Sequence, residues 1–134
     1  MLDYYVGHFD TVEINSTYYG IPHPHVFEAM AKKTPEGFDF MVKAHQSLTH
    51  KRDQLEQETP KYLEAIKPLI ESGKFKGILA QFPWSFPRVP AHLEYLRKCR
   101  QALGNLTLFI EFRHSSWIKY YRGTNTNRRY AQRS

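Results

Sequence analysis

Polar and aromatic side chains capable of chemistry follow each of four apolar segments. These segments are residues 11–14, 38–42, 77–82 and 106–112. An ordinary turn needs only Gly, Asn or Asp, so this clustering points to a binding or catalytic site. The residues concerned are Asn15, Ser16, Tyr18, Lys43, His50, Gln81, Arg113, His114 and Trp117.

Two glutamates lie inside apolar segments. An ionised carboxylate there must be paired or reach water, so Glu13 and Glu111 either belong to a site or point to solvent. Imidazoles and carboxylates are the usual groups for proton transfer near neutral pH. The predicted catalytic residues are therefore Glu13, His50, Glu111 and His114.

Two cations stand beside the same segments. Arg113 can fork onto a phosphate or carboxylate, or form an ion pair with one of the glutamates. Lys43 can contact an anion or act as a desolvated base. The alternative is that Lys43 is simply a solvent-exposed residue at the end of a strand. A small anionic or hydroxylated ligand fits this chemistry. The predicted ligand-binding residues are Asn15, Ser16, Tyr18, Lys43, Gln81, Arg113 and Trp117.

Other kinds of site have weaker support. Imidazoles and carboxylates could bind a divalent metal, but no HExxH or paired CxxC motif is present, and hydrogen-bonded loop histidines are the alternative; we predict no metal site. Phosphate-loop motifs are missing, so the sequence identifies no cofactor and the cofactor stays unknown. No serine has a GxSxG context, so catalysis by a serine nucleophile has little support. Cys99 is flanked by basic residues that are typical of a solvated helix face.

The elements that would hold these residues alternate along the chain. The four apolar segments have the length and composition of strands. Helical periodicity covers residues 24–33, 60–72 and 91–103, with a kink or early end expected at Pro68. Residues 2–8 resemble the end of a helix, and residues 43–58 a long loop, with room for a short helical turn. This order predicts an α/β fold with a parallel sheet.

In such sheets, sites form at the carboxyl ends of the strands. We therefore expect the predicted site residues to point to one rim of the sheet. This expectation would be contradicted if Lys43 and Glu111 lay at opposite ends of the strands.

The 134-residue length fits one domain. The net charge of +6 is misleading, because five basic residues and no acid lie in residues 119–134. We expect a barrel domain at residues 1–118 and a disordered basic tail at residues 119–134. Nucleic acid is not a predicted partner, since the rest of the chain is nearly neutral. No apolar run is long enough for a membrane span and no signal peptide is visible, so the expected location is the cytoplasm.

Four phrases carry a family resemblance. FDTVEINSTYYGIP, TPEGFDFMVKAHQSLTH, ILAQFPWSF and FIEFRHSSW resemble, in order and spacing, the YecE-like family, the domain of unknown function numbered 72. The resemblance covers about residues 3–118. It implies a TIM-type (β/α) barrel of about twice this length, with no settled activity. The matching motif positions are Glu13, Asn15, Ser16, Tyr18, Lys43, His50, Gln81, Pro83, Glu111, Arg113, His114 and Trp117.

The family's first strand has no counterpart before Met1, and its last strands have none after Trp117. The resemblance therefore implies a partial barrel with four strands, open at residues 11–14 and 106–112, where copies could associate. Two functions are expected from this. One is an enzyme acting on a small anionic or hydroxylated ligand, and the other is a non-catalytic fragment or interaction module.

Overall fold

The chain is built on one mixed sheet. The structure is a computed structural model that describes residues 11–120 and 129–132. The strand order is β1-β2-β3-β4-β5, and β1 to β4 run parallel while β5 runs antiparallel to β4. The predicted α/β fold with four parallel strands is confirmed. The strands are β1 (Thr11–Ile14), β2 (Asp39–Lys43), β3 (Phe75–Phe82), β4 (Leu108–Phe112) and β5 (Arg129–Gln132).

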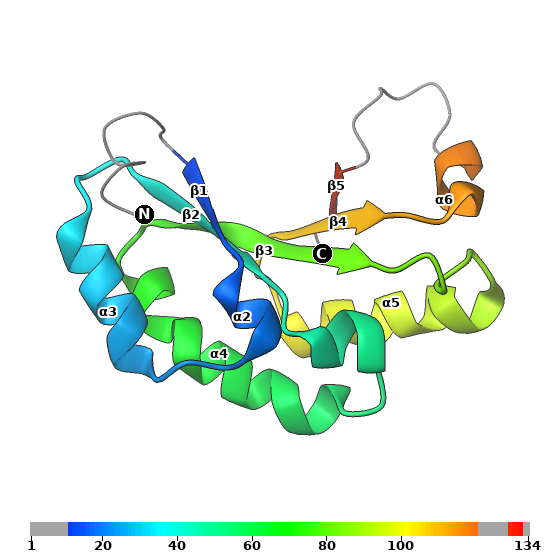
Figure 1. Cartoon of the computed structure of the whole chain (residues 1–134), viewed down its shortest axis with the longest axis horizontal. Coiled ribbons are helices and arrows are strands. Elements are labelled where there is room, and N and C mark those ends of the chain that lie inside the picture. The colour runs from blue at the N-terminus through cyan, green and yellow to red at the C-terminus, as the bar shows by residue number, and fades with distance from the viewer. Residues whose placement is uncertain (1–10, 121–128, 133–134) are drawn as a thin grey trace.

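Helices connect the parallel strands. Figure 1 shows α3, α4 and α5 on the same face of the sheet. The helices are α2 (Ser16–Tyr19), α3 (Pro24–Lys33), the π-helical η1 (Ser47–Lys51), α4 (Leu55–Glu71), α5 (Pro90–Leu103) and α6 (Ser115–Tyr120). All but α6 lie between consecutive parallel strands, as expected for crossover units, whereas α6 lies between the antiparallel strands β4 and β5.

The main core lies between the sheet and these helices. Alternate strand residues such as Phe40, Val42, Ile78 and Ile110 pack into it and are at most 2% exposed. Burying one such side chain contributes about 1.5–3 kcal/mol. Because successive side chains alternate between faces, Glu13, Lys43, Gln81 and Glu111 belong to the opposite face.

The second long helix begins earlier than predicted. Residues 55–58, expected in a loop, form the first turn of α4. Leu55 and Thr59 are buried one turn apart, and Glu56 and Glu58 carry negative charge near the helix N-terminus, where it is favourable. The helix also continues past Pro68 to Glu71, so the early end expected at this proline is wrong.

The predicted open edge at β4 is also wrong. β5 pairs with β4 from Leu108↔Gln132 to Glu111↔Arg129. Periodicity did not reveal β5, because a four-residue strand in a basic context carries little apolar pattern. The start of the tail also differs, since α6 extends to Tyr120. The rest of the predicted tail, 121–128 and 133–134, and the helical end expected at 2–8 lie outside the described residues.

Helices long and apolar enough to cross a membrane are absent from the part of the chain that the structure describes.

Candidate functional site

The carboxyl ends of β1, β2, β3 and β4 form one rim of the sheet. Lys43 is the last residue of β2 and is in register with Leu79, while Glu111 near the end of β4 is in register with Gln81. Lys43 and Glu111 therefore lie toward the same end of the sheet. The geometric expectation of a common rim agrees with the structure.

Five residues make up what is called here the rim cluster: Tyr18, Lys43 and His50, which are in contact, and Arg52 and Arg113, whose charges act on His50. The Lys43 ammonium lies 5.1 Å from the centroid of the Tyr18 ring, within the range of a cation–π contact. Tyr18 and His50 meet edge to face, with ring centroids 5.2 Å apart. A residue after β1, one at the end of β2 and one in η1 are thus brought together.

Buried hydroxyl groups fix the β2 end of the cluster. The main-chain oxygen of Lys43 accepts hydrogen bonds from the Thr17 hydroxyl at 2.6 Å and the Tyr62 hydroxyl at 2.9 Å. Thr17 is fully buried and Tyr62 is 3% exposed. Because Thr17 is next to Tyr18, the same bond anchors α2, and with it Tyr18, to the end of β2.

The π-helical turn η1 presents His50 to the cluster. Turns of this kind are rare and are often found at functional sites. Arg52 ends η1 with a φ of 59°, in the left-handed region that is uncommon for residues other than glycine. Its guanidinium donates to the Thr49 carbonyl oxygen at 2.8 Å and lies 5.0 Å from the Phe86 ring centroid. Arg52 thereby fastens the end of η1 to the loop after β3.

The rim cluster is strongly electropositive. Desolvation lowers the pKa of His50 below its ordinary value, and the charges of Arg52, Arg113 and Lys43 lower it further. Desolvation together with Tyr19 raises the pKa of Tyr18, against an opposing effect of Arg113. At neutral pH, His50 is thus an uncharged imidazole able to accept a proton, and Tyr18 is a protonated phenol.

Gln81 and Glu111 form a second polar pair on the rim. The Gln81 side-chain amide donates to a Glu111 carboxylate oxygen at 2.6 Å. The two residues are direct neighbours across β3 and β4, so the bond follows from the register. Glu13, in register with Met41, is exposed on β1.

Three histidines accept hydrogen bonds at helix starts through the same short motif. Nδ1 of His23 accepts from the backbone N–H of His25 at 3.2 Å. His45 and His114 accept in the same way from Ser47 at 3.2 Å and Ser116 at 3.0 Å. The bond satisfies a backbone donor that a helix start leaves unpaired.

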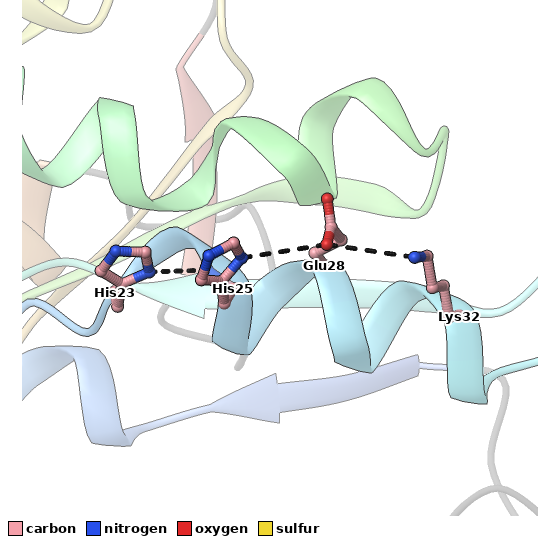
Figure 2. A network of polar contacts seen from close by, with 4 residues as sticks. All are labelled: His23, His25, Glu28 and Lys32. Atoms are coloured by element: carbon pink, nitrogen blue, oxygen red, sulfur yellow. Dashed lines mark hydrogen bonds and ion pairs between the residues drawn. The ribbon is translucent and has the colours of Figure 1, made fainter.

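Figure 2 shows this motif on α3, where His23, His25, Glu28 and Lys32 form a network on the helix surface. The Glu28 carboxylate lies 3.9 Å from both the His25 ring and the Lys32 ammonium. This network is part of the helix surface and does not belong to the rim.

The hydrogen bond from the Ser116 backbone N–H to Nδ1 of His114 determines which ring nitrogen of His114 carries the proton. A neutral imidazole that accepts at Nδ1 carries its proton on Nε2. His114 therefore offers a hydrogen-bond donor at Nε2. The His114 ring packs against Trp84 with centroids 4.5 Å apart, while Trp84 itself is 63% exposed.

Trp117 corrects the predicted ligand-binding set. Its side chain is 1% exposed and stacks on Phe112 and Phe86, and its indole N–H donates to the Phe86 carbonyl oxygen at 2.6 Å. It offers no surface to a ligand, because its ring belongs to the buried core together with Phe86 and Phe112. Asn15 and Ser16 are exposed at the start of α2. Their backbone carbonyl oxygens accept hydrogen bonds from the N–H groups of Tyr18 and Gly20.

Within residues 11–120 and 129–132, no three His, Cys, Asp or Glu side chains are close enough to hold a metal ion. His50 and His114 take part in separate contacts, with Tyr18 and with Trp84.

Sequence reasoning missed three contributors to the rim. Arg52 is absent from the predicted site, because nothing in the sequence signals its left-handed backbone or its contact with Phe86. Tyr62 lies in a helix predicted from its apolar periodicity, yet its hydroxyl reaches the end of β2. Trp84 follows the third predicted strand and is not among the predicted site residues; an exposed tryptophan is uncommon enough to be a usable signal.

Comparisons with known proteins agree with the fold. A family model described as "Protein of unknown function DUF72" matches residues 1–133. The chain is 34% identical over 123 residues to the UPF0759 protein YunF of Bacillus subtilis (strain 168), an alignment that covers 87% of this chain and 44% of that protein.

Solved structures agree as well. A DUF72 family protein from Enterococcus faecalis V583 has a TM-score of 0.82 and 31% identity, covering 88% of this chain and 45% of that one. A DUF72 family protein from Thermotoga maritima MSB8 has a TM-score of 0.72 and 38% identity, covering 87% and 46%. The chain thus spans less than half the length of these relatives.

Proposed function

Because this chain belongs to the DUF72 family of proteins of unknown function, we propose its function from its own rim cluster: binding of a small phosphorylated or carboxylated ligand. His50 would exchange a proton with the bound ligand. The observation that carries the proposal is the contact of Lys43 with Tyr18 and of Tyr18 with His50, beside which the charges of Lys43, Arg52 and Arg113 all act on His50.

Charge supports an anionic ligand. The charges of Lys43, Arg52 and Arg113 all act on His50, and a bound anion would offset their effect. Arg113 is exposed and Lys43 is half-buried, so both are within reach of a ligand arriving from solvent. Arginine favours the two-pronged contact that a phosphate or carboxylate offers.

Proton transfer needs a base that is uncharged at working pH. The lowered pKa of His50 keeps it so. Its Nδ1 lies 2.8 Å from the Thr49 hydroxyl, a 1% exposed group that orients the ring. Tyr18, with a raised pKa, would donate a hydrogen bond to the ligand. The Glu111 carboxylate, held by Gln81, is a second candidate acid or base.

The test is isothermal titration of the chain with inorganic phosphate and pyrophosphate. We expect Arg113→Gln and Lys43→Met each to weaken binding about tenfold or more, since a charged hydrogen bond contributes about 1.5–3 kcal/mol. Lys76→Met is the matched control, because Lys76 is an exposed strand lysine near the start of β3. The proposal is wrong if the parent chain binds neither anion, or if Lys76→Met weakens binding as much as Lys43→Met does.

A non-catalytic interaction module is the second candidate function. The observation in its favour is that α3, α4 and α5 cover only one face of the sheet (Figure 1). The simplest such interaction is the association of two copies of this chain.

A further inference from the structure

Trp84 stands out on the rim because its large apolar ring is left in solvent. It follows β3 in the sequence Phe82-Pro83-Trp84 and is 63% exposed. The indole is nevertheless supported from one side, where it packs on His114 at 4.5 Å with 33° between the ring planes. A large aromatic ring held in place with a free face is suited to stacking on a flat ligand.

His114 adds a polar group beside that ring. Its Nδ1 is occupied by the Ser116 backbone N–H and lies 2.9 Å from the Ser116 hydroxyl. Ser116 is held in turn, because its hydroxyl oxygen accepts from the Arg88 backbone N–H at 2.8 Å. The Nε2–H of His114 is therefore an oriented donor that suits a hydroxyl oxygen.

The aromatic pair adjoins the rim cluster at the end of β4. Arg113 acts electrostatically on Tyr18 and His50, and His114 is the next residue in the chain. Consecutive Cα atoms are about 3.8 Å apart. Arg113 and His114, the residue that supports Trp84, thus project from neighbouring points of the backbone at the end of β4.

We propose that Trp84 and His114 form a sugar-binding subsite, so that the ligand of the rim cluster is a phosphorylated monosaccharide. This inference rests on the proposed anion site. The indole face would stack on the apolar C–H face of the sugar ring, His114 would donate to a ring hydroxyl, and Arg113 with Lys43 would hold the phosphate.

The experiment compares glucose 6-phosphate, AMP and inorganic phosphate as probes in calorimetry and tryptophan fluorescence. Trp117 is buried, so a change on binding would report Trp84. We expect glucose 6-phosphate to bind more tightly than inorganic phosphate and to change the emission. Trp84→Ala should weaken glucose 6-phosphate binding about threefold to tenfold without affecting inorganic phosphate, and Trp84→Phe should restore most of it.

The outcomes separate this inference from the proposed function. If inorganic phosphate binds through Arg113 but Trp84→Ala leaves glucose 6-phosphate unaffected, the anion site stands and the sugar subsite is wrong. Tighter binding of AMP than of glucose 6-phosphate would overturn it in favour of a nucleobase. Failure of all three probes to bind the parent chain would overturn both proposals.

Discussion

His50 is the residue whose surroundings differ most from those of an ordinary surface histidine. Its ring contacts Tyr18, its Nδ1 faces the Thr49 hydroxyl, and Lys43, Arg52 and Arg113 act on its charge. Each of these cations disfavours the imidazolium. An anion bound among them would reverse that effect.

His50 should therefore titrate below the usual histidine range of about 6.5. Its resonances in a pH titration by NMR, assigned with His50→Gln, measure this. Added phosphate should raise the apparent pKa of His50. A midpoint at or above the usual value would contradict the electropositive site.

The sign of the stability effect follows from linkage. The unfolded chain binds a proton at His50 more readily than the folded chain does. The contribution of His50 to stability is therefore complete above the unfolded pKa and is lost as pH falls from there toward the folded pKa.

Cys99 provides a second test at the residue scale. Burial raises the pKa of its thiol to about 12, and the side chain is 1% exposed. At pH 8 this lowers the thiolate fraction roughly a thousandfold relative to an ordinary cysteine. A thiol-specific disulfide reagent should thus label the folded chain at least about a thousandfold more slowly than the same chain in urea. Labelling within tenfold of the unfolded rate would show that α5 opens readily.

At the scale of the elements, Gly77 of β3 leaves no room for a side chain beside Thr107 and Phe109. A Cβ atom there would lie 2.7 Å from the Phe109 ring and 3.0 Å from the Thr107 carbonyl oxygen. The backbone of Ile78 also donates to that oxygen at 2.9 Å, so it cannot move away without losing a hydrogen bond. Glycine is required here by space.

Gly77→Ala should accordingly destabilise the chain by about 1–3 kcal/mol, the usual cost of overpacking. Urea unfolding followed by circular dichroism measures the change. Gly20→Ala is the control, because nothing lies within 4 Å of the added Cβ and the backbone is extended. Equal midpoints for the two variants would mean that the two strands can separate at no cost.

At the scale of the whole molecule, the sheet has two different edges. β5 covers β4, and β1 lies at the opposite end of the strand order. A strand at an edge presents backbone groups that can pair with another chain. Both β1 and β5 are edge strands, but Arg129 in β5 is charged and opposes pairing between copies. The proposed self-association of this chain would therefore use β1.

Sedimentation of the 134-residue chain at micromolar concentration tests this. We expect a dimer that Thr11→Lys dissociates, because an edge lysine opposes strand pairing. Gln57→Lys on the exposed surface of α4 adds the same charge elsewhere and should leave the dimer intact. A monomeric parent chain would rule out association through β1.

The sequence by itself determined the four parallel strands, the main helices and the polar character of the strand ends. Apolar runs separated by helical periodicity are local signals, and parallel strands joined by crossovers must place their carboxyl ends together. The common rim for Lys43 and Glu111 followed from this. The function predicted for that rim stays a prediction.

Only the tertiary structure decided which side chains meet on the rim. The turn of η1 brings His50 to Tyr18, and register pairs Gln81 with Glu111, while Trp117 turns into the core. The sequence did not show β5 either, because this strand pairs with residues about twenty positions earlier in the chain. The hydrogen bond between His114 and Ser116 was also not predictable, because it depends on the local direction of the backbone. Periodicity places a residue on an element, whereas packing between elements determines what its side chain contacts.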